Sequence, residues 1–386
     1  MSNRTKTEVL EKMRRRYVTA GLEHKTKLIN EAVTLFGYHR KAAIRALGAD
    51  PRQRLPLGTG GRPREYESRK LLPVLRAIWE AASCPCGKRL QMMMPDWLAG
   101  YEEHERGVPQ GVREQLTQAS ARTLDRLLEP VRMSSTRQSL TRPGSLLRHQ
   151  IPIRGAFWEE GKAGWLEVDT VALCGGSVAG DFIWMLDGVD YQTAWVTVRA
   201  MWNRGQEGTL RALKDLEQSL PFALLGLDSD NGGEFLNHHV VRWLQHRSSP
   251  VCMTRSRPYK KDDNAHVEQK NWTHVRKWFG YERYDNAEVL EPMNELVRGP
   301  YAQLLNYFHA SMKLESKDRD DKSGKIRRVY GKPQTPLSRV LQSTEVREET
   351  KRGLRREKNG INPFALKAEV DRRLKEIEKI RARKKE

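Results

Sequence analysis

Three short acidic stretches carry residues suited to metal-dependent chemistry. They are Glu167-Val168-Asp169-Thr170, Asp228-Ser229-Asp230-Asn231-Gly232 and His266-Val267-Glu268. Carboxylates are hard oxygen ligands, and a cluster of them holds Mg²⁺ or Mn²⁺ without filling every coordination position. Two such ions, about 3.5–4 Å apart, activate an attacking oxygen and stabilise a leaving oxygen in a displacement at phosphorus. The stretches therefore predict a site for two Mg²⁺ ions, with Mn²⁺ as a substitute.

Spacing does not separate neighbouring acids within each stretch. Glu167 and Asp169 share one face of a predicted strand, and Asp228 and Asp230 share a face of another, because side chains alternate along a strand. Asp230 is preferred to Asp228 because Asn231-Gly232 ends its strand, and ligands gather at the carboxyl ends of parallel strands. Nothing in the spacing chooses between Glu167 and Asp169.

The acidic stretches lie in a region with an alternation of predicted strands and helices. Strands are predicted over residues 165–172, 182–188, 194–201, 222–227 and 251–255, and helices over residues 206–219, 234–246 and about 263–279. Three strands followed by alternating helices and strands is the ribonuclease H-like order. We therefore expect an α/β core with a mixed five-stranded sheet.

With these motifs in this order, the segment from Gly164 to Leu341 resembles the catalytic core of retroviral-type integrases and bacterial insertion-sequence transposases. The three acids fall in that family's order, and the separation of Asp230 from Glu268 is close to the family's. The stretch from Lys332 to Arg339 is similar to the segment that follows its core. The resemblance implies that Asp169, Asp230 and Glu268 are the catalytic metal ligands, and this is the reason for preferring Asp169. It also implies nicking of DNA by water and joining by a DNA 3′-hydroxyl, without a covalent protein–DNA intermediate.

Two segments before this core have the pattern of a helix-turn-helix. Apolar residues at helical spacing from His24 are followed by Phe36-Gly37-Tyr38 and a second helix up to Leu47. Helices predicted over residues 71–82, 96–103, 112–116 and 121–128 give a second module. The last helix of each module would face the major groove of DNA, and an ordinary helical hairpin with a solvated basic face is the alternative. The candidate contacts are Arg40, Lys41, Arg45, Arg122 and Arg126.

Further basic residues lie in predicted loops and beside Glu268. Gly60-Gly61-Arg62-Pro63-Arg64 is similar to arms that follow a minor groove, although flexible basic linkers have the same composition. A basic loop interleaved with Tyr259 precedes the last core helix, as in surfaces that bind single strands. Lys270, His274 and Lys277 form a polar stripe on that helix, with a phosphate contact or a solvated face as its two interpretations. The candidate DNA contacts here are Arg62, Arg64, Arg255, Arg257, Lys260, Lys261, Lys270 and Lys277.

The C-terminal part is expected to contain helices over residues 288–312, then a small β-barrel implied by the family resemblance. Residues 345–386 mix Arg, Lys and Glu at helical spacing, which predicts either a basic tail that binds DNA or a partner subunit, or a solvated, fraying helix. We divide the chain into helix-turn-helix modules at 1–50 and 70–132, a basic Gly/Pro/Arg linker at 51–69, a second linker at 133–160, the core at 161–285, a helical extension at 286–316, the barrel at 317–344 and the basic tail at 345–386.

The overall charge favours a nucleic-acid partner. The chain has a formal net charge of +20 from 69 Lys and Arg against 49 Asp and Glu, which attracts polyanions. No apolar run approaches the length of about 18 residues that a membrane span needs, and no secretory signal is evident, so we expect a cytoplasmic, nucleoid-associated bacterial protein. Cys84-Pro85-Cys86 lacks the second pair of ligands that a structural zinc site requires.

The sequence thus predicts a transposase that binds the terminal inverted repeats of a mobile element and joins them to target DNA. Pairing two ends implies a homo-oligomer on double-stranded DNA, and whether a helper ATPase takes part is left open. Two alternatives remain. One is a sequence-specific DNA-binding regulator with a non-catalytic ribonuclease H-like scaffold, and the other is a hydrolytic nuclease that never joins strands.

Overall fold

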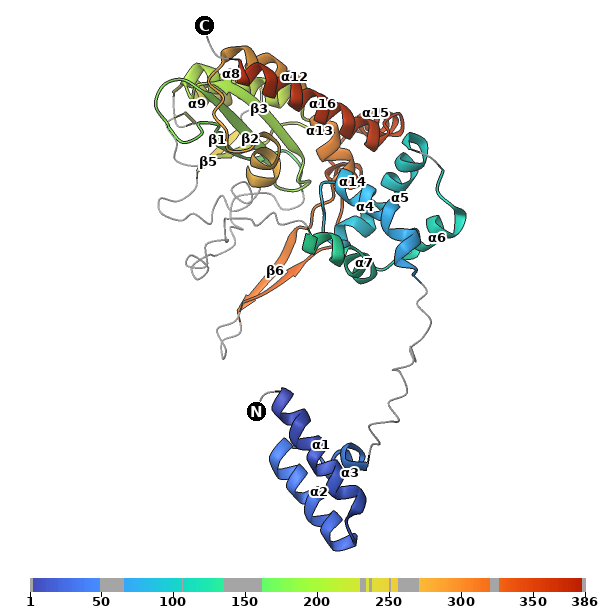
Figure 1. Ribbon diagram of the computed structural model, residues 1–386. Coiled ribbons are helices and arrows are strands. Elements are labelled where there is room, and N and C mark those ends of the chain that lie inside the picture. The colour runs from blue at the N-terminus through green and yellow to red at the C-terminus, as the bar shows by residue number, and fades with distance from the viewer. Residues whose placement is uncertain are drawn as a thin grey trace. The chain divides into compact units, whose positions relative to one another are not determined.

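The computed structural model describes residues 3–48, 66–105, 107–134, 162–229, 234–235, 238–249, 251–255, 271–319 and 326–383. The chain divides into two compact units, Met1–Glu65 and Tyr66–Glu386 (Figure 1). Within the described ranges, no helix has both the length and the apolar composition needed to cross a membrane.

The first unit is a bundle of three helices. They are α1 (Asn3–Thr19), α2 (Leu22–Phe36) and α3 (Arg40–Gly48). Gly37 ends α2 in the left-handed conformation, at φ 65°, and its N–H donates to Val33 O at 3.0 Å, a conformation for which glycine carries no steric cost. The predicted pair of helices is therefore present. Helix α1 was not predicted, because its buried Leu10 and Met13 are surrounded by charged residues.

The second unit begins with four helices, α4 (Ser68–Ala81), α5 (Gly87–His104), α6 (Gln110–Gln118) and α7 (Ala121–Ser134). Helix α5 starts at Gly87, well before the predicted start at residue 96. The predicted start was late because a proline such as Pro95, which lies inside this helix, is typical of the first turn of a helix. Leu90, Met94 and Trp97 are fully or almost fully buried, so one face of α5 forms the core of this helical module.

A mixed five-stranded sheet follows, as predicted. Its strands are β1 (Trp165–Ala172), β2 (Ile183–Asp190), β3 (Val196–Trp202), β4 (Gly226–Ser229) and β5 (Cys252–Arg255). Their order in the sheet is β3-β2-β1-β4-β5. β1 pairs antiparallel with β2, β2 pairs antiparallel with β3, and β1, β4 and β5 run parallel. This is the order expected of a ribonuclease H-like core. Strand β4 was predicted at residues 222–227 and lies at Gly226–Ser229, because the first part of the apolar run leads into the strand.

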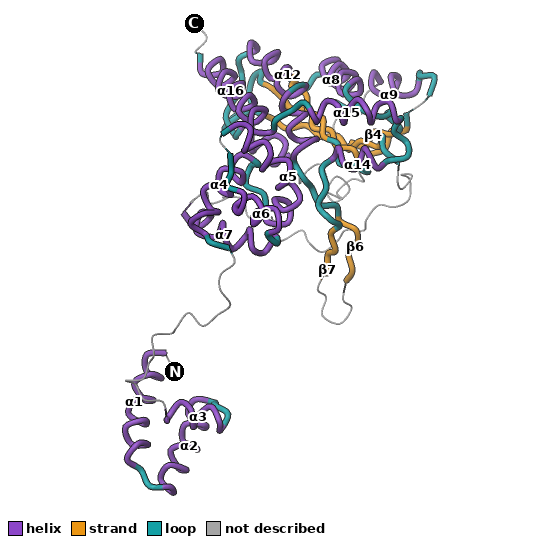
Figure 2. Tube along the Cα trace, turned by 90° about the vertical axis from the view of Figure 1, so that its right-hand side faces the viewer, coloured by secondary structure: helices purple, strands orange, loops and turns teal. Residues whose placement is uncertain are grey.

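Helices cover both faces of the sheet (Figure 2). Leu166, Val168 and Leu186 pack on one face against α8 (Gln206–Gln218) and α9 (His238–Gln245). The other face packs against α12 (Leu290–Arg298), α13 (Pro300–Gln303) and two π-helices, η3 (Trp272–Arg276) and η5 (Leu304–Phe308). Short helices α11 (Lys277–Phe279) and η4 (Ala287–Val289) extend this layer.

Two asparagine side chains close the outer edge of β3. The amide of Asn306 donates to Val196 O and accepts from Val196 N, both at 2.8 Å. The amide of Asn294 makes the same pair of bonds with Ala200, at 2.9 and 3.0 Å. Unpaired N–H and C=O groups on an edge strand invite pairing with another chain, so these amides protect the edge.

The region predicted as a small β-barrel contains a two-stranded hairpin instead. β6 (Leu314–Arg319) pairs antiparallel with β7 (Ile326–Tyr330), and no third strand joins them within the described residues. The Pro-rich stretch that follows starts a helix, α14 (Pro336–Gln342), because Thr335 Oγ1 accepts from Ser338 N at 3.1 Å and Pro336 fits the first helical position. The barrel prediction was wrong at this point.

The C-terminal segment is a packed layer of the second unit. α15 (Glu348–Asn359) and α16 (Pro363–Ala382) follow α14. Phe364, Val370 and Ile377 of α16 are buried, and α16 contacts α5, α12 and α13. Lys358 Nζ lies 2.7 Å from Asp96 Oδ2. The described part of this segment is therefore neither a free tail nor a solvated helix, because its apolar residues are buried in the core.

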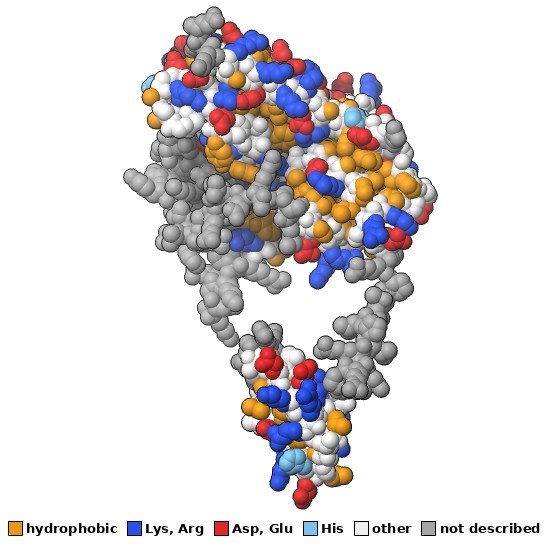
Figure 3. All heavy atoms as spheres, viewed as in Figure 1, with side chains coloured by type: hydrophobic (Ala, Val, Ile, Leu, Met, Phe, Trp, Pro, Cys, Tyr) orange, Lys and Arg blue, Asp and Glu red, His pale blue; other side chains and the backbone are white. Residues whose placement is uncertain are grey.

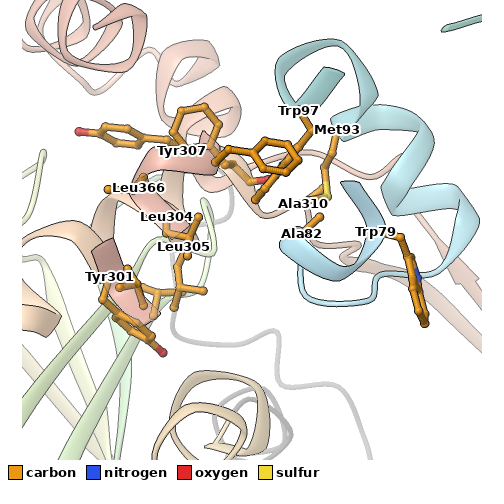
Figure 4. Close-up of a cluster of buried hydrophobic side chains, with 14 of the residues drawn as sticks. Trp79, Ala82, Met93, Trp97, Tyr301, Leu304, Leu305, Tyr307, Ala310 and Leu366 are labelled. Carbon is orange, nitrogen blue, oxygen red and sulfur yellow. The ribbon is translucent and has the colours of Figure 1, made fainter. Parts of the chain in front are cut away.

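Aromatic side chains join the helical module to the rest of the second unit (Figure 4). Trp97 Nε1 donates to Phe308 O at 3.2 Å. The ring of His309, whose Nε2 is buried, lies between Trp97 and Trp278, with centroid separations of 6.3 and 6.2 Å. Burial lowers the pKa of His309 to about 3, and the charges of Lys277, Lys367 and Arg89 and the neighbouring His274 act in the same direction.

We predict that the unfolding free energy of His309→Gln falls less steeply in acid than that of the wild type. A histidine in the unfolded chain takes up a proton below about pH 6.5, whereas His309 in the folded chain stays neutral down to about pH 3. Unfolding free energy therefore falls as pH falls from about 6.5 to 3, by up to about 1.4 kcal/mol per pH unit for this group. Denaturant unfolding at a series of pH values measures the slope. Exposed His246→Gln is the matched control, and equal slopes for wild type and His309→Gln would contradict the assignment.

Candidate metal-binding site and DNA contacts

The candidate catalytic residue Asp169 lies on the central strand of the sheet and is partly exposed. Its Oδ1 accepts from Thr170 N at 2.7 Å, and its Oδ2 accepts from Asn271 Nδ2 at 2.6 Å. In the parallel pairing of β1 with β4, Val168 is the partner of Ser229. Asp169 thus sits where β4 ends and where the chain re-enters the described residues at Asn271.

The other two predicted ligands, Asp230 and Glu268, lie outside the described residues. The same holds for the predicted DNA contacts Arg62, Arg64, Arg257, Lys260, Lys261 and Lys270, and for the side chain of Arg255, which ends β5. Among the residues that are described, no three His, Cys, Asp or Glu side chains are grouped closely enough to hold a metal ion.

The neighbouring acids Glu167 and Asp228 face each other across β1 and β4. Both are buried, with 5% and 1% of their surface exposed. Thr254 Oγ1, from β5, donates to Asp228 Oδ1 at 2.5 Å. These two carboxylates are therefore part of the interior, whereas Asp169 reaches solvent.

A buried pair that the sequence analysis did not predict lies beside Asp169. Asp187 is the cross-strand partner of Asp169 on β2 and is fully buried. His274 Nδ1 lies 3.0 Å from Asp187 Oδ2, and Tyr301 donates its hydroxyl to the carbonyl of His274. Burial raises the pKa of the Tyr301 hydroxyl, which keeps it a donor. His274 was assigned to an exposed polar stripe, and the π-helix turns it inward.

A further buried carboxylate, Glu234, lies on the opposite face of the sheet. Glu234 is almost fully buried, and its Oε1 accepts from Thr170 Oγ1 at 3.2 Å and lies 3.2 Å from Arg204 NH1. Thr170 follows Asp169, so Glu234 ties the segment after β4 to the end of β1. Its position four residues after Asp230 is the only sequence signal of this role.

The described basic candidates have different surroundings. On α3, Lys41 and Arg45 are exposed, and Arg40 donates to Asn30 Oδ1 at 2.9 Å. On α7, exposed Arg122 and Arg126 line a cavity of about 530 Å³ together with Asp125, Glu129 and Arg132. Lys277 is exposed and donates to Ser83 O at 2.5 Å. Basic and acidic side chains are interspersed over the face of the molecule seen in Figure 3.

No family model matches the chain. The uncharacterized protein y4rM of Sinorhizobium fredii (strain NBRC 101917 / NGR234) is 34% identical over 348 residues, which cover 88% of this chain and 96% of y4rM. The chain belongs to the y4rM family.

Solved structures similar to this member of the y4rM family are catalytic cores of retroviral integrases. The BIV integrase core is 16% identical, covers 50% of this chain and 99% of its own, and has a TM-score of 0.29. The HTLV-2 integrase core in complex with magnesium, in its dimeric form, is 16% identical, covers 42% and 92%, and has a TM-score of 0.28. The fold of this chain is assigned from its own strand order and register.

We predict that Asp187→Ala lowers the unfolding free energy by about 3 kcal/mol or more, because removal of one partner leaves the other buried and uncompensated. Asp187→Ala combined with His274→Ala should cost less than the sum of the single changes. Denaturant unfolding of the four proteins measures this coupling.

The control is Glu80→Ala, which removes an exposed partner of Arg76 at 2.8 Å on α4. It should change stability by less than about 1 kcal/mol. Additive costs for Asp187 and His274 would contradict the buried pair.

Proposed function

We propose that this protein is a DNA transposase of the retroviral-integrase type, with Asp169, Asp230 and Glu268 as its acidic ligands. The observation that carries the proposal is the hydrogen bond from Asn271 to Asp169 at the point where β1 and β4 run side by side. It supports the proposal that the three acidic stretches, which are far apart in sequence, lie close together in space.

Covalent geometry narrows the distances involved. Ser229, the partner of Val168, is bonded to Asp230, and consecutive Cα atoms are about 3.8 Å apart. Glu268 lies three residues before Asn271, so their Cα atoms are at most about 11 Å apart. These covalent connections support the proposal that Asp230 and Glu268 join Asp169 in one site.

Exposure favours Asp169 over Glu167 and, by analogy, Asp230 over Asp228. A scissile phosphate must approach the metal ligands, and the buried Glu167 and Asp228 offer no such access. Thr254 already occupies one oxygen of Asp228. We assign these two acids to the support of the site rather than to metal binding.

The donor set fits Mg²⁺. Carboxylate oxygens are the ligands that this ion prefers, and Asn271 adds a buried Oδ1 that has no hydrogen-bond donor among the described residues. When bound, two Mg²⁺ ions would activate the attacking oxygen and stabilise the leaving oxygen. Asn271 would orient the Asp169 carboxylate, because its Nδ2 donates to Oδ2.

The substrate would be double-stranded DNA, both element ends and target. The net charge of +20, the exposed Lys41 and Arg45 of α3 and the exposed Arg122 and Arg126 of α7 support recognition of DNA by the two helical modules. Joining two ends to a target requires a homo-oligomer, and we place the reaction in the bacterial cytoplasm, on the nucleoid.

We predict that Asp169→Asn reduces Mg²⁺-dependent nicking and strand joining by about three orders of magnitude or more, because the change removes several kcal/mol of transition-state stabilisation. Asp230→Asn and Glu268→Gln should have the same effect, while DNA binding without metal is retained. Cleavage of a duplex that carries the sequences flanking the gene, followed on a gel with labelled 3′ ends, measures both steps.

Exposed Asp181→Asn is the matched control and should remain active. Equal nicking by wild type and Asp169→Asn would refute the site. Metal-independent binding by an inactive wild type would instead favour a DNA-binding regulator, and nicking without joined products would favour a hydrolytic nuclease.

A further inference from the structure

Trp272 is an exposed tryptophan beside the candidate site. It follows Asn271, whose side chain holds Asp169, and 48% of its surface is exposed. A large apolar ring in water carries a cost that burial would remove. Its position one residue from a partner of the candidate metal ligand distinguishes it from exposed side chains elsewhere on the surface.

A π-helical turn gives this ring a cationic neighbour. Residues Trp272–Arg276 form η3, and the N–H of Lys277 donates to Trp272 O, five residues back. This wider turn brings side chains five apart onto one side, and Lys277 Nζ lies 5.9 Å from the Trp272 ring centroid. In an α-helix with 3.6 residues per turn, the two would diverge around the axis. Single π-turns of this kind occur frequently at functional sites.

The cation is held in place from outside the helix. Lys277 Nζ donates to Ser83 O, in the turn between α4 and α5. Ser83 and Cys84 of that turn both have positive φ, at 65° and 56°. The helical module thus positions the ammonium group, which combines with the indole ring into one surface next to Asp169.

We propose that Trp272 and Lys277 form a stacking platform for an unpaired nucleotide of a DNA strand as it enters the carboxylate site. The inference deepens the proposed function and rests on it for the identity of the substrate. An indole face stacks on any base, and an ammonium group beside it suits the adjoining phosphate. The platform therefore selects a frayed or single-stranded end over an intact duplex, in which every base is already stacked.

The experiment compares binding of a short single-stranded oligothymidylate and a blunt duplex to the full-length protein. Both are measured by fluorescence anisotropy in EDTA, so that no cleavage occurs. Trp272→Ala should weaken single-strand binding about 10- to 100-fold, the range for loss of one stacked base, and duplex binding by less than about 3-fold. Trp272→Phe should restore most of the single-strand affinity.

Tyr330→Ala is the matched control, because that ring is 50% exposed on the β6–β7 hairpin. It should leave single-strand binding unchanged. Unchanged single-strand affinity in Trp272→Ala would overturn the proposal, and so would a change only in the oligomeric state measured by light scattering. Because the readout needs neither metal nor cleavage, its failure leaves the transposase assay intact, and an inactive site leaves this measurement interpretable.

Discussion

Four carboxylates on one face of the sheet set the constraint on which the rest of the structure depends. Asp169 is paired with Asp187 across β1 and β2, and Glu167 with Asp228 across β1 and β4. Like charges at facing positions repel, so each needs donors brought from elsewhere. Asn271 supplies one to Asp169, His274 one to Asp187, and Thr254 one to Asp228. The segment that carries Asn271 and His274 is thereby fixed against the acidic face.

This segment is held in turn by the layers outside it. Tyr301 donates to the carbonyl of His274, and Trp278 packs edge-on against Tyr301 at 5.3 Å and beside His309. Trp97 of the helical module then bonds to Phe308. A continuous set of contacts therefore runs from the acidic face of the sheet to α5. The helical module therefore helps to position the candidate site.

The sequence predicts most of the strands and helices of this fold, but little of the packing between residues that are far apart in the chain. β1 was predicted with its observed bounds because its apolar residues alternate, and Gly37 marked the end of α2. The packing of α16 was not foreseen, because Phe364, Val370 and Ile377 are scattered among charges and their partners on α5 and α12 are far away in sequence. The barrel was carried over from family resemblance, and the local capping signal at Thr335-Pro336 was stronger. Asn294 and Asn306 gave no signal, since their role exists only against the edge of β3.

The same distinction explains why the sequence offered candidate ligands and no sign of the residues around them. Asp169 was singled out because its acidic motif belongs to a three-part pattern, whereas Asp187 and His274 have no motif and meet only when β2 lies beside β1. The π-turn at Trp272–Arg276 is decisive here. It lets one short segment turn His274 inward to Asp187, keep Asn271 on Asp169, and leave Trp272 in solvent beside Lys277. Regular α-helical spacing, which the sequence analysis assumed, places His274 and Lys277 in one exposed stripe and separates Lys277 from Trp272. The wider π-turn therefore determines both which side chains are buried beneath Asp169 and which side chains are exposed beside it.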